Sequence, residues 1–450
     1  MTEHAPDVVV IGAGAAGLAA ASALRERHLS VVVLEARERI GGRVFTLHDA
    51  DLAAPVELGA EFLHGSAPEV KEIVERARLT AVDIDGERWE SRQGAWRPMS
   101  DFWKRLDVVM RRLDAERDPD RSFADFLAHR PGGRRLARER ALALQWVEGF
   151  HAADPGRASE RALADGGSPG DDVSEQRLGR ILNGYSTALQ WLARDLHDRI
   201  RLGSIVTAIR WAPSEVEIAR QQMDGSSRPA ITARAAIVCV PLGVLQAPTG
   251  EPGAITFDPP LEHDGAKRRA LAGAAMGAVV RVSIRTRERF WATDRFASRH
   301  GSAPLDRLAF LHTSDEHFPV WWTAYPAHVP MLTAWSGGLR ALAMSALTPE
   351  QISELALRSL AAQFGLSRRE LRRQVERTWT HNWQSDPFAR GAYSYIVVGG
   401  IDAPKQVARP LRRALFFAGE ASDAEGRTGT VHGAIASGRR AAREVARALE

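Results

Sequence analysis

Glycines and an acidic residue near the amino terminus have the spacing of a nucleotide-binding loop. The segment GAGAAG places Gly12, Gly14 and Gly17 in the order G-x-G-x-x-G. In such a loop the first glycine permits a tight turn, the second lets the backbone approach a pyrophosphate, and the third lets helix and strand pack closely. Glu35 follows about 20 residues later, where a carboxylate can accept the ribose 2′-hydroxyl of a dinucleotide. The same carboxylate would repel a 2′-phosphate, so the spacing predicts a dinucleotide other than NADP.

The residues around this loop have the pattern of the elements that must position it. The runs DVVVI (7–11) and VVVL (31–34) are continuous and mostly β-branched, as in parallel strands that are buried on both faces. Residues 18–27 between them are rich in alanine and predict a helix. Together they form a βαβ unit, which places the loop at a helix N-terminus, where backbone N–H groups favour phosphate.

A second glycine pair follows the second strand and distinguishes between dinucleotides. After Glu35, Ala36 and Arg37 the chain continues to Gly41, Gly42 and Arg43. The glycines allow another close backbone approach, and the arginine can neutralise more pyrophosphate. NAD-binding units do not usually carry this addition.

The motif E-A-R-x-R-x-G-G-R after such a unit resembles the flavin-dependent amine oxidases, which include monoamine oxidases, polyamine oxidases and histone lysine demethylases. The resemblance extends over nearly the whole chain. It includes, in the same order, VELGAEFLHG (56–65), ILNGYSTALQWLA (181–193), VPLGVL (240–245), MGAVVRVSIRTRERFW (276–291), WQSDPFARGAYSY (383–395) and FFAGEASDAEGRTGTVHGAIASGRRAARE (416–444).

This resemblance implies FAD as the cofactor and assigns positions around it. Gly59, Ala60, Glu61 and Phe62 would pass along the reactive edge of the isoalloxazine ring, and Val206 would offer backbone groups to the adenine. Glu420, after Gly419, would hold a ribose or ribityl hydroxyl. Trp383 and Phe388 would pack beside the flavin. Thr430 and Val431 would offer backbone N–H groups near its pyrimidine at a helix start, where the negative charge of reduced flavin is favoured; the alternative is an ordinary helix entry.

The segment RGAYSY bears on how the flavin is attached. Monoamine oxidases bind FAD through a cysteine immediately before a tyrosine that walls the substrate site. Ala392 holds that place before Tyr393, and alanine cannot form a thioether, so the resemblance implies noncovalent FAD. Tyr393 is a candidate wall that favours an amine through its π face, or else a core residue. In monoamine oxidases the opposite wall of the substrate site falls within the segment that GRTGT (426–430) resembles. No aromatic residue occurs in GRTGT, so the resemblance implies a wider site on the side opposite Tyr393.

His64 lies in an LHG context similar to that of animal polyamine oxidases. A neutral imidazole there can bind a substrate amine or help to remove its proton; the alternative is a satisfied core or loop histidine. Glu61 and Glu148 are candidates to supply negative charge to a cationic substrate.

Arg281 departs from the pattern of the family that the chain resembles. In the alternating segment 276–291 it lies where the apolar run is densest, and relative to Phe290 and Trp291 it holds the place of a family lysine that binds a water at flavin N5 and is associated with reoxidation by oxygen. Arginine keeps the charge but cannot exchange protons as lysine does. We therefore expect Arg281 to replace that lysine, with oxygen reactivity in question; the alternative is a solvent-facing arginine.

Bulk composition excludes several classes. A hydrophobic share of 44% and a charged share of 26% are those of a soluble globular protein, and no secretory signal or membrane span is visible, so a cytoplasmic protein is expected. The net charge is +4, but arginines alternate with acids and no nucleic-acid motif accompanies them. His312, Asp315 and His317 fit no standard metal spacing, and Cys239, in a buried strand pattern, gives no support for nucleophilic catalysis.

The expected fold combines α/β and α+β parts. A Rossmann-type FAD-binding domain is assembled from residues 1–75, 196–262 and 400–450, and a substrate-binding domain of mixed sheet and helices from 76–195 and 263–399. The expected function is oxidation of a small-molecule amine by hydride transfer to flavin N5, imine hydrolysis, and reoxidation by oxygen to hydrogen peroxide. Alternatives are an amine dehydrogenase or desaturase that reacts poorly with oxygen, and a noncatalytic FAD-binding protein. Neither the identity of the amine nor the oligomeric state follows from the sequence.

Overall fold

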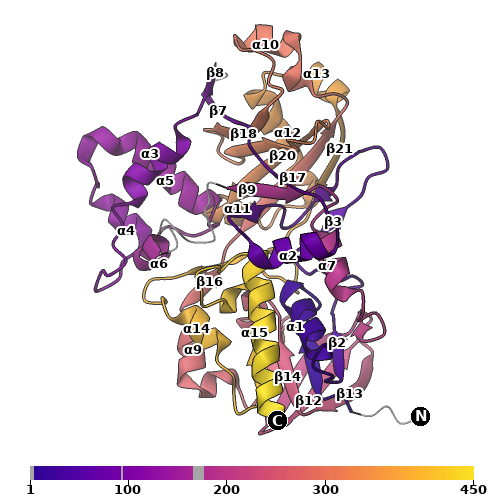
Figure 1. Cartoon of the computed structure of the whole chain (residues 1–450). Helices are drawn as coiled ribbons and strands as arrows, with labels where there is room; N and C mark the ends of the chain where they lie inside the picture. Colours follow the sequence, from indigo (N-terminus) through magenta and orange to yellow (C-terminus); the bar gives the residue numbers. More distant parts are fainter. Residues whose placement is uncertain (1–4, 93–94, 166–176) are drawn as a thin grey trace.

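The first architectural unit is a five-stranded parallel sheet to which the N-terminal and C-terminal parts of the chain both contribute strands (Figure 1). The computed structural model describes residues 5–92, 95–165 and 177–450. The strand order is β10-β2-β1-β14-β23, so three separated parts of the sequence build one sheet. Alternate residues of β1 enter two different apolar cores, one on each face, which is why its sequence is apolar throughout. The strands are β1 (Val8–Ile11), β2 (Val31–Leu34), β10 (Ile200–Arg201), β14 (Ala235–Val238) and β23 (Leu415–Phe417).

Helices cover one face of this sheet. The first helix, α1 (Ala15–Arg25), packs along the last, α15 (Val431–Leu449), as Figure 1 shows. A Cβ atom on Gly438 would come within 2.1 Å of the Ala16 carbonyl oxygen, so the glycine is what lets the two helices approach. Beside them lie α2 (Pro68–Arg76) and α7 (Ser186–Ala193).

A four-stranded sheet covers the opposite face. Its order is β13-β12-β11-β15, and its apolar side chains share a core with alternate residues of β1 and β14. The strands are β11 (Ile205–Ala212), β12 (Glu215–Gln221), β13 (Ser227–Ala233) and β15 (Thr256–Asp258).

The second unit is a mixed seven-stranded sheet with the order β21-β17-β20-β19-β18-β7-β8. Its neighbours β20 and β21 flank β17 on both sides, so the strand that carries Arg281 is interior. The long helix α12 (Pro349–Gln363), which begins at a capping box formed by Thr348 and Gln351, packs on this sheet. The strands are β7 (Glu87–Arg92), β8 (Ala95–Pro98), β17 (Val279–Thr286), β18 (Leu308–Thr313), β19 (Val320–Thr323), β20 (Met331–Gly337) and β21 (Val375–Thr380).

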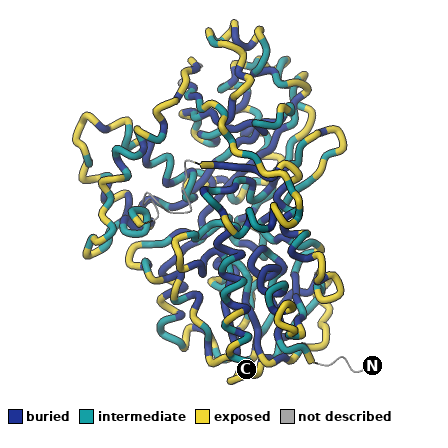
Figure 2. Tube along the Cα trace, in the orientation of Figure 1, coloured by how far each residue is buried: buried dark blue, intermediate teal, exposed yellow. Residues whose placement is uncertain are grey.

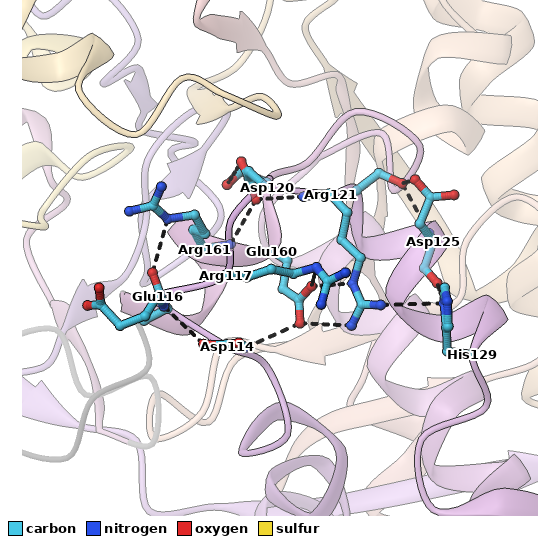
Figure 3. Close-up of polar contacts among 12 residues, drawn as sticks. Asp114, Glu116, Arg117, Asp120, Arg121, Asp125, His129, Glu160 and Arg161 are labelled. Carbon is cyan, nitrogen blue, oxygen red and sulfur yellow. Dashed lines mark hydrogen bonds and ion pairs between the residues drawn. The ribbon is translucent and has the colours of Figure 1, made fainter.

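A helical lobe projects from the side of the two sheets (Figure 1). It contains α3 (Phe102–Met110), α4 (Phe123–Ala128), α5 (Ala137–Gly149) and α6 (Glu160–Asp165). Glu160 is fully buried at the start of α6 and accepts hydrogen bonds from Arg121 and from the Asp114 backbone N–H (Figure 3). This buried carboxylate fastens the loop before α4 to α6, one wall of the site described below.

Short elements connect these units. They are β3 (Thr46–Leu47), β4 (Val56–Glu57), β5 (Leu63–His64), β6 (Ala81–Asp83), β9 (Leu178–Ile181), β16 (Ala274–Met276), β22 (Ser394–Ile396), α8 (Leu242–Leu245), α9 (Gly265–Ala272), α10 (Asp294–His300), α11 (Gly338–Ala343), α13 (Arg368–Gln374), α14 (Ala403–Ala408), and the 3-10 turns η1 (Gly133–Leu136), η2 (Leu261–His263), η3 (Phe290–Ala292) and η4 (Glu420–Ser422). Figure 2 shows that exposure is concentrated on outer loops and that the chain is buried where the sheets meet their helices.

Two features of the packing bear on the predicted division into domains. The β7–β8 hairpin lies within the part predicted to bind substrate, and buried Trp89 and Trp96 anchor it in the core of the seven-stranded sheet. The predicted division assigned α7 and α9 to the substrate-binding part, yet both helices contribute to the cores around the parallel sheet. The domain boundaries themselves stay a prediction.

Among the described residues, none of the helices combines the length and apolar character needed to cross a bilayer.

Candidate active site

One cavity of about 610 Å³ connects the parallel sheet to the seven-stranded sheet and the helical lobe. Every predicted cofactor or catalytic residue lines it except Gly17. Gly17 lies behind the loop, where an added Cβ would stand 1.8 Å from the Gly12 carbonyl oxygen, so its role is to let the helix pack against the strand.

The first glycine loop has the geometry that a nucleotide requires. Gly12 has a φ of 100°, which favours glycine, and Gly14 is the N-cap of α1 without any side-chain cap. The Glu35 carboxylate accepts the backbone N–H of Ala13 at 2.7 Å and of Arg37 at 2.9 Å, and burial raises its pKa. Each oxygen keeps a second lone pair for a ligand hydroxyl. Val206 and Ala36 also line the cavity.

The second glycine pair packs directly on the first loop. Gly41 forms an isolated parallel bridge with Gly14, and Gly42 has a φ of 58°. Arg43 lines the cavity and donates through Nη1 to the Ala392 carbonyl oxygen at 2.7 Å and to Glu420 at 2.8 Å. These bonds fix the guanidinium beside the loop that a pyrophosphate would contact.

Glu420 joins the start of α15 to the tyrosine segment. Its Oε2 accepts from the Ser394 hydroxyl at 2.6 Å and from the Gly429 backbone N–H at 3.1 Å. The N-cap of α15 is Thr430, whose Oγ1 accepts the Gly433 N–H at 3.0 Å. The first turn of this 19-residue helix holds no acidic residue of its own, and Thr430 and Val431 at its positive end line the cavity. Gly419, with a φ of 141°, and Val431 complete this wall.

These features fit FAD. Two glycine loops, a buried carboxylate and two helix N-termini line one continuous cavity, as a dinucleotide with two phosphates and a ring system that becomes anionic on reduction requires. Trp383 is buried against this wall with its Nε1 donating to the Leu58 carbonyl oxygen at 2.8 Å, and Phe388 also lines the cavity.

Arg281 belongs to a buried cluster of charged side chains beside the segment from Gly59 to Phe62. Its side chain is only 3% exposed, so the alternative of a solvent-facing arginine is wrong. Nη1 donates to the Gly59 carbonyl oxygen at 3.1 Å, and Nη2 donates to Glu61 Oε2 at 2.5 Å. The guanidinium is thereby tied to the segment from Gly59 to Phe62.

Glu61 is shared between two arginines. Its Oε1 lies 3.1 Å from Nη1 of Arg180, and its Oε2 also accepts Trp322 Nε1–H at 3.1 Å. The suggested role of Glu61 as free negative charge for a cationic substrate is therefore not available, because both oxygens are neutralised. Glu148 likewise pairs with Arg340 at 3.5 Å and is not among the residues that line the cavity.

Glu57 adds a titratable group to this cluster. It is 5% exposed and accepts the Thr46 hydroxyl and the Tyr185 backbone N–H, each at 2.7 Å. Burial raises its pKa to about 7, partly offset by those hydrogen bonds. The charge of the cluster therefore changes near neutral pH.

His64 and Tyr393 lie beyond this cluster in an aromatic chamber. Burial, and next the neighbouring His432, lower the pKa of His64 to about 4, so its imidazole is neutral at pH 7. Its buried Nδ1 has no hydrogen-bond partner in the described part of the chain. The Tyr393 hydroxyl donates to the Phe150 carbonyl oxygen at 2.6 Å, which holds the ring in place. Other rings of the chamber are Phe62, Phe102, Trp146, Phe150, Phe310, Trp322 and Trp335.

Sequence analysis missed Arg180, Trp322 and Glu57. A signal was present for Arg180, since LGRI (178–181) is a buried strand that carries one charge, as at Arg281. The aromatic and glutamate positions have no such local signal.

Two negative expectations concern other chemistry. Cys239 lies at the carboxyl end of β14 and lines the cavity, but burial raises the pKa of its thiol, so it is not a thiolate. Asp315 accepts the backbone N–H groups of His317 and Phe318, and His312 lies on the cavity wall. Among residues 5–92, 95–165 and 177–450 no three histidine, cysteine or acidic side chains gather as a metal site.

Comparison with known proteins places the chain among flavoproteins. The family model described as flavin containing amine oxidoreductase matches residues 15–446. Polyamine oxidase 3 of Oryza sativa subsp. japonica is 29% identical over 98% of this chain and 89% of its own length. Lysine-specific histone demethylase 2 of Homo sapiens is 28% identical over 98% of this chain and 54% of its own length.

Solved structures share the fold. A wild-type putrescine oxidase bound to putrescine superimposes with a TM-score of 0.77 at 23% identity, covering 98% of this chain and 99% of the other. The cyclohexylamine oxidase of Brevibacterium oxydans IH-35A gives a TM-score of 0.77 at 20% identity, covering 99% of each chain.

Proposed function

Because this chain belongs to the flavin-containing amine oxidoreductase family and is thus an enzyme that uses FAD, we propose that it oxidises a small-molecule amine with noncovalently bound FAD and molecular oxygen. The observation that carries the proposal is the continuity of the cavity. It extends from the glycine loops past the Gly59–Phe62 segment into the aromatic chamber, so that one cofactor can meet one substrate inside it.

When bound, FAD would supply the redox chemistry, taking a hydride from the α-carbon of a neutral amine and returning the electrons to oxygen as hydrogen peroxide. The imine product would hydrolyse in water. The protein supplies position, electrostatics and exclusion of bulk solvent.

The aromatic chamber serves to hold the amine in its neutral form. Its walls are apolar, and a neutral amine is required because an ammonium has no lone pair to stabilise the forming imine. His64, neutral and with Nδ1 unpartnered in the described residues, is the group placed to form a hydrogen bond with the neutral amine. Tyr393, fixed by its bond to Phe150, offers a π face at the same chamber.

The Arg281 cluster bears on the oxygen step. A guanidinium stays charged and keeps its hydrogen bonds to Gly59 and Glu61, so it offers a fixed positive field and no exchangeable proton. The field of Arg281 is partly cancelled by Glu61, while Arg180 adds a second positive charge behind it. We therefore assign Arg281 an electrostatic role toward oxygen.

The test is anaerobic mixing of the purified yellow protein with a panel of amines, with flavin absorbance as the readout, followed by admission of air. Bleaching by an amine and rapid recovery in air, with hydrogen peroxide formed in equal amount, supports an oxidase. Bleaching with slow recovery that Arg281→Lys accelerates by tenfold or more would instead support an amine dehydrogenase. If no amine bleaches a fully bound flavin, amine oxidation is refuted and a noncatalytic role gains support.

A further inference from the structure

Three nitrogen donors surround one ring in the aromatic chamber, away from the Arg281 cluster. Arg88, Trp146 and His312 all line the cavity and all lie against Phe102. The Arg88 guanidinium carbon is 5.0 Å from the Phe102 ring centre, and the Trp146 and His312 ring centres lie 5.7 Å and 4.8 Å from it. They come from three elements, β7, α5 and β18, which the fold brings together.

None of these donors has an acceptor among the described residues. The Trp146 Nε1–H and the His312 Nε2 atom are buried and make no hydrogen bond in the described part of the chain. His312 Nε2 donates in the neutral tautomer that carries its proton there. Arg88 contacts the faces of Phe102, Trp103 and Phe310, and within residues 5–92, 95–165 and 177–450 its guanidinium has no carboxylate partner. Buried N–H groups without acceptors are costly, so such a group of donors indicates a ligand that accepts hydrogen bonds.

The charge of the site selects an anion. Burial lowers the pKa of Arg88 to about 10, which leaves it cationic at neutral pH. Burial and the nearby Arg88 lower the pKa of His312 to about 3, so this imidazole stays neutral and adds no second charge. One cation with two neutral donors matches the single charge of a carboxylate better than the double charge of a phosphate.

Acidic side chains on the cavity wall do not reverse this preference. Glu61 is neutralised by Arg180 and Arg281, and Asp165 is exposed at the end of α6. The remaining acids that line the described cavity, Glu35, Asp402, Glu420 and Asp423, belong to the side of the glycine loops and of α14 and α15. A substrate with two or more positive charges would therefore meet Arg88 without a compensating carboxylate.

The site is also within reach of the reacting end of the cavity. Arg88 and Phe310 are register partners on β7 and β18, with the guanidinium 4.3 Å from the Phe310 ring centre. The ring centre of Phe310 in turn lies 5.9 Å from that of Phe62, the last residue of the segment assigned to the flavin edge. A short aliphatic chain along these two rings would join an amine at the flavin edge to an anion at Arg88.

We propose that Arg88, Trp146 and His312 form a carboxylate-binding subsite, and that the substrate of this enzyme is an amine that also carries a carboxylate. This inference rests on the proposed amine oxidation for its second half only; anion binding at Arg88 stands independently. It distinguishes this chain from a polyamine oxidase, whose substrate is a polycation.

The experiment compares three ligands of equal length with the FAD-bound protein: aminohexanoate, hexylamine and hexanediamine. Anaerobic flavin reduction gives the apparent Kd and the limiting rate for each. The expected order of affinity is aminohexanoate first, hexylamine second and hexanediamine last. Arg88→Gln should weaken aminohexanoate by roughly 10- to 100-fold, the effect of one charge-assisted contact, and change hexylamine by less than about threefold.

Two matched controls separate recognition from folding. Arg97→Gln removes an exposed arginine from the adjacent strand β8 and should change none of these constants. Trp146→Phe keeps a ring but removes the N–H, and should weaken aminohexanoate by about three- to tenfold. The matched control Trp191→Phe alters a ring on α7 that contacts Arg194 and does not line the cavity, and should leave aminohexanoate binding unchanged.

Hexanoate, which cannot be oxidised, tests the subsite without catalysis. Perturbation of the flavin spectrum by hexanoate, lost in Arg88→Gln, supports the subsite even if no amine reduces the flavin, in which case the proposed function alone fails. The subsite is overturned if hexanediamine binds more tightly than aminohexanoate, if Arg88→Gln weakens hexylamine and aminohexanoate equally, or if hexanoate binding does not depend on Arg88.

Discussion

Replacing Glu61 with glutamine tests whether the buried ion cluster is a closed unit. Glutamine keeps the size of the side chain and one acceptor oxygen but removes the charge shared by Arg180 and Arg281. The two arginine contacts are 3.1 Å and 2.5 Å long, and all three residues are at most 9% exposed. Glu61→Gln therefore leaves two guanidinium groups close together with no full counter-charge between them.

The size of the effect follows from this burial. Removing one partner of a buried ion pair costs about 3–5 kcal/mol, since the remaining charge is left uncompensated. Glu57, with a pKa raised to about 7, can ionise further and replace part of the lost charge, so we expect the lower end, about 3 kcal/mol. The double variant Glu61→Gln with Arg281→Met removes one excess cation and should recover roughly 2 kcal/mol relative to the sum of the single changes.

The assay is urea unfolding of the FAD-bound proteins at one fixed FAD concentration, followed by circular dichroism and flavin fluorescence. The matched control is Glu217→Gln, which breaks a 2.6 Å ion pair with Arg210 on the exposed surface of the four-stranded sheet, where the cost should stay below about 1 kcal/mol. If Glu61→Gln costs no more than Glu217→Gln, the cluster is hydrated in solution and its proposed electrostatic role toward oxygen loses its basis.

Three further predictions concern pH and the cofactor. Burial raises the Glu57 pKa from 4.5 to about 7, so the stability that its protonated form contributes is fully present below about pH 4.5 and is lost as the pH rises through 7. Between about pH 4 and pH 8 the free energy of unfolding of wild type, measured with urea, should fall by roughly 3 kcal/mol relative to that of Glu57→Gln. The same pH dependence in both proteins would contradict this. Acid precipitation should release all flavin into the supernatant, because Ala392 carries no sulfur; a yellow pellet would disprove noncovalent binding. His64→Gln should slow anaerobic flavin reduction by roughly 100-fold. Because burial lowers the His64 pKa to about 4, the pH profile of this rate should keep the same shape above about pH 5 in both proteins. A break near pH 6.5 in wild type alone would show that His64 titrates there.

The cofactor side of the site is the part that sequence reasoning anticipated best. Gly12, Gly41 and Gly42 have positive φ angles that few other residues adopt, so their positions carry structural information locally. Glu35 follows from the same βαβ unit, because the second strand must end beside the first loop. Such features depend on short segments and therefore survive in the sequence pattern.

The substrate side could not be predicted in the same way. The β7–β8 hairpin is anchored in part by Trp96, whose ring contacts Phe296 in α10 and Phe364 at the end of α12. Both partners lie two hundred or more residues away in the sequence. The pairing of Arg180 with Glu61 depends on β9 lying beside β5. Neither relation has a local signal, because side chains from distant segments decide it.

Arg88 and Arg281 show what structure adds to a pattern that looks alike in sequence. Each is a charged residue on a strand of the seven-stranded sheet. Each is expected to have a partner, since burying an unpaired guanidinium costs free energy. Arg281 finds its partner in Glu61, which closes the cluster and gives it a fixed electrostatic role. Arg88 lies against aromatic faces, and no carboxylate among the described residues pairs with it, which is the observation behind the proposed substrate carboxylate. The difference between a completed ion pair and an incomplete one is the basis on which we propose that Arg281 acts near the cofactor and Arg88 on the substrate.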